Sequence, residues 1–378
     1  MGKKILLFLL TSVMVLSMTA CGDSAKKTVT KENAGEGMKI AIVSSPAGVD
    51  DHSFNEDNYN GILSFIESHP GAPVTPVQEP TGDTAAALAT VADIVADYNV
   101  IVCCGFQFAG ISEIAQENPD VKFILVDTFP SDVDGNEVEV DNIFAMCFAE
   151  QESGFFAGMA AALETKTNKV SVVNGFAYPS NVNYQYGFEC GVKYVNGTEG
   201  KNVEIIELPA YAGTDVTGAD VGGNYIGSFA DIETGKVIGK ALIAKDVDVI
   251  FTAAGTAGSG VLAAVKEADD VWYIGCDIDQ YDDGADGDRN VMLTSAIKVM
   301  HRDVERTLNA ISVGFFGGGN VTLQADTGST GYVSTEGRNQ LSAGTIEKLD
   351  AAYESLILGD IVPAANFNDI TPDDFTWE

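Results

Sequence analysis

Hydrophobic residues follow two patterns that alternate along the chain from residue 39 to residue 276. Short, continuously apolar runs rich in β-branched residues predict strands that are buried on both faces. Between these runs, apolar residues recur every three or four positions, which predicts helices. The predicted strands are residues 39–45, 100–104, 121–127, 169–173, 203–208, 247–252 and 271–276. The predicted helices are residues 55–69, 84–98, 111–117, 153–163, 183–195, 232–244 and 257–267.

This alternation predicts an α/β fold with parallel sheets that helices cover on both sides. Two such sheets account for the length of the chain. With right-handed crossovers, each sheet forms a doubly wound lobe. Ligands of such sheets bind beyond the carboxyl ends of the strands. The loops there are rich in Gly, Asp, Asn and aromatic residues, which suits a neutral, flat ligand with hydroxyl groups. These loops are residues 44–55, 104–108, 127–130, 174–180, 251–260 and 275–284.

The first 37 residues do not follow the alternating pattern. Two lysines precede an apolar run, residues 5–15, which has the length of a signal-peptide core and is too short to cross a bilayer. Residues 1–20 are therefore interpreted as a lipoprotein signal peptide, because Cys21 ends the string LSMTAC, which resembles a bacterial lipobox. Acyl chains on Cys21 would hold the protein at the extracytoplasmic face of the cell membrane. An ordinary signal peptide is the alternative. The polar residues 21–37 predict a flexible tether.

Charge and composition narrow the possible functions. The 378 residues include 55 acidic and 21 basic ones, a formal net charge of −34, and no segment forms a basic stripe. Such a chain would repel DNA and RNA, so nucleic-acid binding is excluded as a main activity. Three histidines, His52, His69 and His301, are too few for a histidine-rich metal site. Five cysteines follow Cys21, and their odd number and apolar surroundings predict small buried side chains rather than a disulfide framework.

Motifs of enzymes are missing from the sequence. It has no GxGxxG after the first predicted strand, no Walker A motif and no GxSxG elbow. The Gly-rich residues 255–260 have the wrong spacing for a phosphate loop and no lysine after them. Asp277 and Asp279 could form an acidic metal pair, but two carboxylates at this spacing are a weak metal signal. We therefore expect no catalytic residue, no metal and no cofactor.

Taken together, the strand-end loops resemble the basic membrane lipoprotein (BMP) family. Its members are solute-binding lipoproteins of ABC importers, and its best-known branch binds purine nucleosides. The resemblance is specific because the matching stretches occur in family order between residues 38 and 310. They are DDHSFN (50–55), GFQF (105–108), NPDVKFILVD (118–127), EQESGFFAG (150–158), GSFAD (227–231), AAGTAG (253–258), IGCD (274–277) and TSAIK (294–298).

The resemblance implies a type I periplasmic-binding-protein fold, in which two lobes close about a hinge and trap the ligand. Crossovers between the lobes would lie near residues 145–150 and near Asp277. The N-terminal lobe would then comprise residues 38–148 and about 278–318. The C-terminal lobe would comprise residues 149–277 and about 319–378.

Ligand-binding residues are implied one by one. Phe54 and Phe229 correspond to the aromatic residues that stack on the two faces of the base. Asn55 and Asp127 match polar contacts in the cleft.

On the sugar side, Gly255 matches the position where the backbone approaches the ribose. Asp277 matches the carboxylate that accepts hydrogen bonds from the ribose hydroxyl groups. Lys298 matches a ligand-contacting lysine, which could also pair with Asp277 when the site is empty.

Two departures from the family pattern leave parts of the interpretation open. Purine-binding members end the first strand with an Asp that reads the base edge, but this chain has Ser45 there. A hydroxyl group reads a base edge differently from a carboxylate, so a pyrimidine nucleoside or a larger flat ring stays open beside a purine. The segment 211–223 is longer than is usual for the family. It forms either a loop on the lobe surface or part of the cleft rim.

The resemblance predicts a monomeric, lipid-anchored binding protein that is not an enzyme. It would bind a nucleoside, with a purine as the first expectation, and deliver it to ABC permease subunits. One alternative is another flat hydroxylated ligand such as riboflavin. A second is a nucleoside-hydrolysing enzyme that uses Asp50, Asp51 or Asp277. A third is a surface sensor, which the sequence does not separate from an importer.

Overall fold

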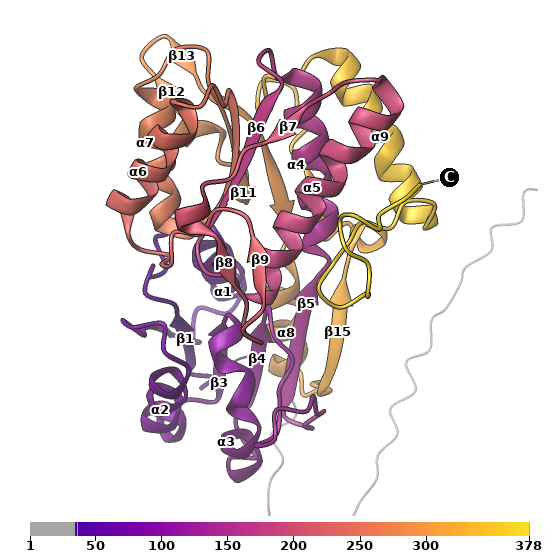
Figure 1. The fold of residues 1–378 in the computed structure, drawn as a ribbon. Coiled ribbons are helices and arrows are strands. Elements are labelled where there is room, and N and C mark those ends of the chain that lie inside the picture. Colours follow the sequence, from indigo (N-terminus) through magenta and orange to yellow (C-terminus); the bar gives the residue numbers. More distant parts are fainter. Residues whose placement is uncertain (1–34, 36, 378) are drawn as a thin grey trace, which may run out of the picture.

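The computed structural model describes residue 35 and residues 37–377. These residues form two lobes stacked end to end, each built on a six-stranded sheet with helices on both faces (Figure 1). The α/β architecture predicted from the alternating pattern is therefore confirmed. The predicted signal peptide, Cys21 and almost all of the predicted tether lie outside the described residues.

The lower lobe in Figure 1, called the N-lobe here, contains the first strand and an entirely parallel sheet. Its strand order is β15 (Gly319–Leu323), β5 (Ile143–Phe148), β4 (Lys122–Val126), β3 (Val100–Cys104), β1 (Ile40–Ser44) and β2 (Val74–Gln78). Its helices are α1 (Phe54–Ser68), α2 (Thr84–Ile94), α3 (Ser112–Glu117) and α8 (His301–Ser312).

The upper lobe, called the C-lobe here, has a parallel sheet with one antiparallel edge strand, β16. Its order is β16 (Thr330–Tyr332), β14 (Met292–Lys298), β11 (Trp272–Asp277), β10 (Val249–Ala253), β6 (Lys169–Asn174) and β7 (Glu204–Ile205). Two small hairpins, β8 (Gly213–Thr214) with β9 (Asp220–Gly222) and β12 (Ala285–Asp286) with β13 (Arg289–Asn290), complete the strands. Its helices are α4 (Glu150–Glu164), α5 (Pro179–Glu199), α6 (Ile232–Ile243), α7 (Gly258–Lys266) and α9 (Ala343–Leu358).

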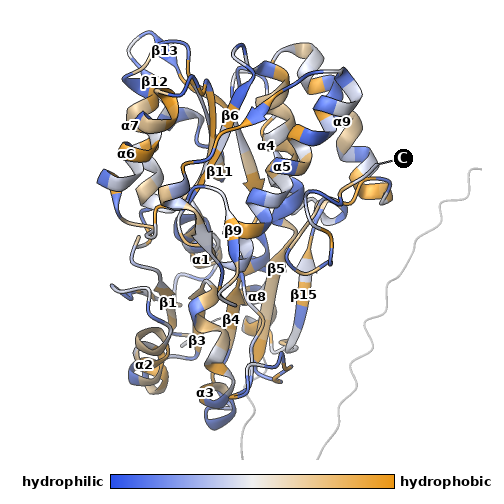
Figure 2. Ribbon diagram, viewed as in Figure 1, coloured by the Kyte–Doolittle hydropathy of each residue, from blue (hydrophilic) through white to orange (hydrophobic). Residues whose placement is uncertain are grey.

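Both sheets carry a hydrophobic core on each face, as the continuous apolar runs predict. In β1, Ile40 and Ile42 belong to the core beneath α1 and α8, whereas Ala41 and Val43 belong to the core beneath α2. Figure 2 shows these strands as hydrophobic elements inside each lobe, with hydrophilic residues concentrated on the outer helix faces and loops. Parallel strands covered on both faces need apolar residues at every position, because successive side chains point to opposite faces.

The predicted division into lobes differs from the observed one in two segments. β14 pairs with β11 through Asp277 and Ile297 and so belongs to the C-lobe sheet, although residues 278–318 were assigned to the N-lobe. β15 pairs with β5 and so belongs to the N-lobe sheet, although it was assigned to the C-lobe. The crossover predicted near Asp277 is therefore wrong. The chain instead crosses between β5 and α4, between β14 and α8, and between β15 and β16.

Glycines let α4 and α5 lie in direct backbone contact. A Cβ atom on Gly154 or Gly158 would lie 2.4 or 2.1 Å from a carbonyl oxygen of α5. A Cβ on Gly187 or Gly191 of α5 would lie 2.1 or 2.2 Å from a carbonyl oxygen of α4. No other residue type fits at these positions without separating the helices. The close packing places the N-terminal turns of both helices at the interface between the lobes.

Among the described residues, no helix is long and apolar enough to cross a membrane. The five cysteines after Cys21 are all free thiols, and four of them are buried.

Candidate functional site

All eight predicted site residues line one cleft between the lobes. The space inside its walls is about 540 Å³, counted to include the open mouth of the cleft. The structure thus brings together residues that are up to 253 positions apart in the chain, from Ser45 to Lys298. The predicted residues in the lining are Ser45, Phe54, Asn55, Asp127, Phe229, Gly255, Asp277 and Lys298.

The carboxylates of the cleft lie where strands end. Asp277 is the last residue of β11, and Asp127 follows the last residue of β4. Both have a left-handed backbone, with φ of 67° for Asp277 and 64° for Asp127. This conformation is unfavourable for residues other than glycine and tends to persist where function requires it. The sharp turn at each strand end keeps the carboxylate at the cleft instead of in the sheet.

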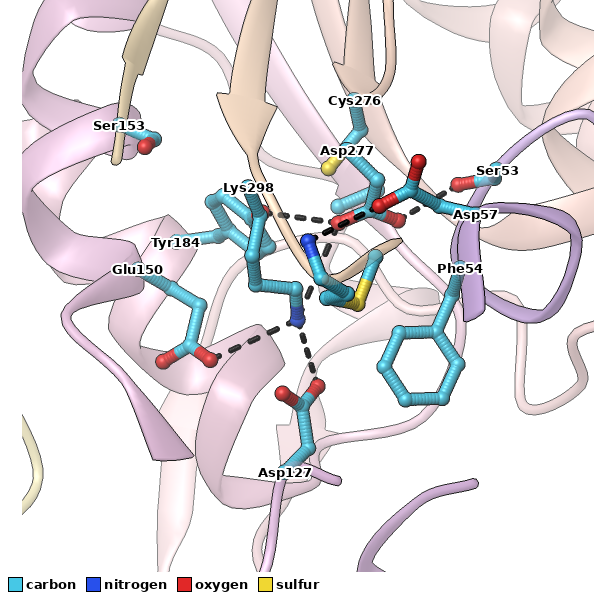
Figure 3. Close-up of polar contacts among 12 residues, drawn as sticks. Ser53, Phe54, Asp57, Asp127, Glu150, Ser153, Tyr184, Cys276, Asp277 and Lys298 are labelled. Atoms are coloured by element: carbon cyan, nitrogen blue, oxygen red, sulfur yellow. Dashed lines mark hydrogen bonds and ion pairs between the residues drawn. The ribbon is translucent and has the colours of Figure 1, made fainter. Parts of the chain in front are cut away.

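Lys298, at the end of β14, is the centre of a buried charge cluster that joins the lobes (Figure 3). Its Nζ lies 2.6 Å from Oδ2 of Asp127, 3.5 Å from Oε1 of Glu150 and 3.8 Å from Oδ1 of Asp277. The side chain of Lys298 is only 2% exposed. The expected pairing of Lys298 with Asp277 is therefore present, but the shortest ion pair is with Asp127 of the N-lobe.

One cation faces three carboxylates in this cluster, and the pKa values reflect that imbalance. Burial raises the pKa of Glu150 to about 8, and Lys298 opposes this only in part. Burial also raises the pKa of Asp127, against the effect of the same lysine. For Lys298, burial acts to lower the pKa, but the carboxylates outweigh burial and hold it above its usual range. At neutral pH, Lys298 is thus charged and Glu150 mostly protonated.

Asp277 accepts hydrogen bonds from hydroxyl groups of both lobes. Ser53 Oγ of the N-lobe donates to Oδ2 at 2.6 Å, and the hydroxyl group of Tyr184 on α5 donates to Oδ1 at 2.9 Å. Figure 3 shows the carboxylate between these two side chains. A carboxylate has about four acceptor sites, so Asp277 keeps lone pairs for the hydroxyl groups of a ligand.

Beside α1, Asp51 supports the loop that carries the predicted polar contacts. Its carboxylate accepts hydrogen bonds from the backbone N–H groups of Ser53, Asn55 and Glu56 and from Nδ2 of Asn55. Burial raises the pKa of Asp51 to about 6, and these hydrogen bonds limit the shift. Asp51 therefore satisfies the N-terminal N–H groups of α1 and holds Asn55 in place.

Aromatic rings of both lobes line the cleft. In the N-lobe, Phe54 is half-buried, and Nζ of Lys298 lies 4.8 Å from its ring centroid. In the C-lobe, the ring of Phe229 lies 5.4 Å from Phe176 and 6.0 Å from Tyr178. A Cβ on Gly175 would lie 2.2 Å from the Phe229 ring, so this glycine lets the ring lie against the backbone. The flat walls suit a flat ligand.

Several cleft residues were not among the predicted ones. Phe106 and Tyr178 lie in two strand-end loops of the sequence analysis, and Ser53 lies in a third, so position was a usable signal for them. Glu150 and Tyr184 lie on helices and gave no such signal. Tyr184 lines the cleft, and Glu150 lies 3.5 Å from the cleft residue Lys298, because α5 and α4 begin beside it.

Other expectations concerned residues outside the cleft lining. Asp279 forms an ion pair with Arg338, at 2.7 Å, and not a pair with Asp277. In the described part of the chain, no group of three or more His, Cys, Asp or Glu side chains could hold a metal ion. Residues 211–223 form the β8–β9 hairpin and contribute no residue to the described cleft lining, which supports a surface loop rather than a cleft rim.

A model of a known protein family matches most of the chain. The model of a family described as "ABC transporter substrate-binding protein PnrA-like" (Bmp) matches residues 38–206 and 217–365. The gap between these ranges overlaps residues 211–223, the segment that is longer than usual for the family. Because the matched ranges cover most of the chain, they include both lobes and every residue of the predicted site.

Curated relatives extend over nearly the same length. The CD4+ T-cell-stimulating antigen of Listeria monocytogenes is 30% identical over 364 residues, which cover 90% of this chain and 92% of that protein. The ABC transporter nucleoside-binding protein BmpA of Lactococcus lactis is 28% identical over 333 residues, 82% of this chain and 85% of that protein.

Solved structures support the fold. An ABC transporter solute-binding protein from Aeropyrum pernix aligns with a TM-score of 0.73 at 21% identity, covering 89% of this chain and 95% of that one. A second, from Conexibacter woesei, aligns with a TM-score of 0.62 at 19% identity, covering 87% and 99%. The type I periplasmic-binding fold predicted from the sequence is therefore confirmed.

Proposed function

The chain belongs to the Bmp family of PnrA-like ABC transporter substrate-binding proteins, and we propose that its ligand is a nucleoside bound between the two lobes. The family assignment makes it a substrate-binding protein and not an enzyme, with a small-molecule ligand and permease subunits as partners. The finer proposal of a nucleoside draws on the name of the Lactococcus relative and on the chemistry of the cleft.

The observation that carries the proposal is the pairing of aromatic walls with a hydroxyl-accepting carboxylate. Phe54 on one side and Phe229 on the other offer flat apolar faces to a base, and such stacking contributes about 1–3 kcal/mol per base. Asp277 offers remaining lone pairs to vicinal hydroxyl groups such as those of ribose. A nucleoside has both a flat ring and a hydroxylated sugar.

Charge favours a nucleoside over a nucleotide. Lys298 is the cation among the described residues that line the cleft, and the carboxylates of Asp127 and Asp277 lie 2.6 and 3.8 Å from its Nζ. A phosphate group would meet more negative than positive charge there, whereas a neutral ligand would not.

We further propose that the protein is a monomer anchored by lipid on Cys21 at the extracytoplasmic face of the cell membrane. The lipobox-like string before Cys21 supports this anchor. Mass spectrometry of the membrane-extracted protein tests it, because the mature N-terminus should carry acyl chains, and Cys21→Ser should release the protein from the membrane fraction.

Calorimetry tests the nucleoside proposal. Residues 38–378 are titrated with purine and pyrimidine nucleosides, the matching free bases and 5′-monophosphates, and riboflavin. Nucleosides should bind at micromolar Kd or tighter and raise the melting temperature. No heat and no melting shift with any nucleoside would refute the proposal. Binding of riboflavin alone, or release of free ribose during incubation, would favour the alternatives named above.

Asp277→Ala separates the sugar contact from the base contact. The variant should lose more affinity for a nucleoside than for its free base, because it removes the acceptor for the ribose hydroxyl groups. Asp269→Ala, at an exposed position of the same lobe, is the matched control and should bind as the unaltered chain does. Equal losses for nucleoside and base would contradict the role of Asp277.

A further inference from the structure

A chain of hydrogen bonds from Asp51 to Ser45 fixes the orientation of the Asn55 amide. Nδ2 of Asn55 donates to Oδ2 of Asp51 at 2.7 Å and to Oγ of Ser45 at 3.0 Å. Oδ1 of Asn55 accepts from the backbone N–H of Ser45 at 3.3 Å. A flipped amide would place its oxygen against the Asp51 carboxylate and its NH₂ group against a backbone N–H, so the network permits only one orientation.

This orientation decides what the hydroxyl group of Ser45 can do. Its oxygen accepts a hydrogen bond from Asn55 Nδ2 and a longer one, at 3.4 Å, from the backbone N–H of Ala47. Both lone pairs are thus engaged, while no described residue accepts the hydroxyl proton. Ser45 is 8% exposed and lines the cleft, so its free proton is available to a ligand there.

Ser45 contacts the start of the helix that carries Phe54. Phe54 and Asn55 are adjacent at the start of α1, and Asn55 contacts Ser45 directly. Ser45 and Phe54 line the same cleft, so a ring stacked on Phe54 can present an edge to the Ser45 hydroxyl group. A hydroxyl group with one free proton and no free lone pair can bond only to an acceptor on that edge.

We propose that Ser45 acts purely as a hydrogen-bond donor and selects nucleosides with a carbonyl oxygen on the ring edge facing it over those with an amino group. The members of each pair differ at one ring position, C6 of a purine or C4 of a pyrimidine. There inosine, guanosine and uridine carry a carbonyl oxygen, whereas adenosine and cytidine carry an amino group. The inference rests on the proposed nucleoside function and deepens it. An amino group would place its own protons against the Ser45 proton and leave both donors unpaired.

Calorimetry with two matched pairs, inosine with adenosine and uridine with cytidine, tests this selection. For each pair that binds, the carbonyl member should bind about tenfold more tightly. The carbonyl member accepts a hydrogen bond from Ser45, whereas the amino member leaves this donor unpaired. Ser45→Ala should bring the ratio of the Kd values close to one. Ser45→Asp, which replaces the donor with a carboxylate acceptor, should reverse the preference toward the amino member.

Ser259→Ala, at an exposed serine on α7, is the control, and melting curves of every variant establish that it folds. A preference of the unaltered chain for the amino members would overturn the donor role of Ser45, as would a ratio that Ser45→Ala leaves unchanged. Absence of binding by all four nucleosides is a separate result, which overturns the proposed function together with this inference.

Discussion

Replacing Lys298 with methionine is the sharpest test of the charge cluster. Methionine has a similar length and removes only the charge and the ion pairs. Lys298 lies 2.6 Å from Asp127 and within 4 Å of two more carboxylates, all of them buried. The variant therefore leaves three carboxyl groups close together without a cation.

The cost should depend on pH. Removing one partner of a buried ion pair typically costs about 3–5 kcal/mol, which for lobes of this size corresponds to about 10 °C in melting temperature. In the variant, Asp127 and Glu150, whose pKa values burial raises, lose the lysine that opposes this shift. A raised pKa contributes stability at low pH that is lost as pH rises. We therefore expect the full loss at pH 8 and a much smaller loss at pH 5, where the carboxyl groups take up protons.

Melting of Lys298→Met and of the unaltered chain, followed by circular dichroism at pH 5 and pH 8, gives the two differences. Lys245→Met, at an exposed lysine, is the matched control and should change the melting temperature little at either pH. The reasoning about the cluster would be refuted by a Lys298→Met loss that is the same at both pH values, or by one no larger than that of the control.

Two further predictions concern stability. Because burial raises the pKa of Glu150 from 4.5 to about 8, its contribution to stability is complete below pH 4.5 and is lost as pH rises through 8. Glu150→Gln should therefore flatten the fall in melting temperature between pH 5 and 8, and a curve parallel to that of the unaltered chain would contradict this. Gly158→Ala would place a Cβ 2.1 Å from the carbonyl oxygen of Phe188 and should destabilise the C-lobe by about 1–3 kcal/mol in chemical denaturation. Gly344→Ala, in a helix with open space at this position, should not destabilise it, and equal losses for the two variants would argue against the packing explanation.

The fold was largely predictable because its strands are buried on both faces. β1 and β3 are completely buried, so their apolar runs stand out from the amphipathic helices beside them. Membership of a lobe was not predictable in the same way. β14 belongs to the C-lobe because it pairs with β11, and nothing in its own pattern of residues distinguishes one apolar sheet from the other. The length of an edge strand was also not predictable from the apolar pattern. The pattern predicted a strand of six residues, 203–208, but β7 has two.

For the site, the position of a residue was predictable and its hydrogen bonding was not. The strand-end rule and the family resemblance together led to eight residues that share one cleft. Asn55 was expected to contact the ligand, but both protons of its amide are used by Asp51 and Ser45. Glu150 escaped detection because its place in the cluster depends on how α4 starts at the crossover from β5. Such relations arise only when distant segments pack together.

A strongly acidic chain can still discriminate among ligands through the groups that line its cleft. A net charge of −34 repels anions in general but does not decide what a buried cleft accepts. Salt screens the interactions of surface charges beyond about 10 Å. Two local features favour the proposed neutral ligand. Lys298 is matched by carboxylates, and the N–H groups at the start of α1, which could otherwise hold a phosphate, are bonded to Asp51. The groups that commonly bind phosphate are therefore already occupied at these two places, which supports the proposed neutral ligand over a nucleotide.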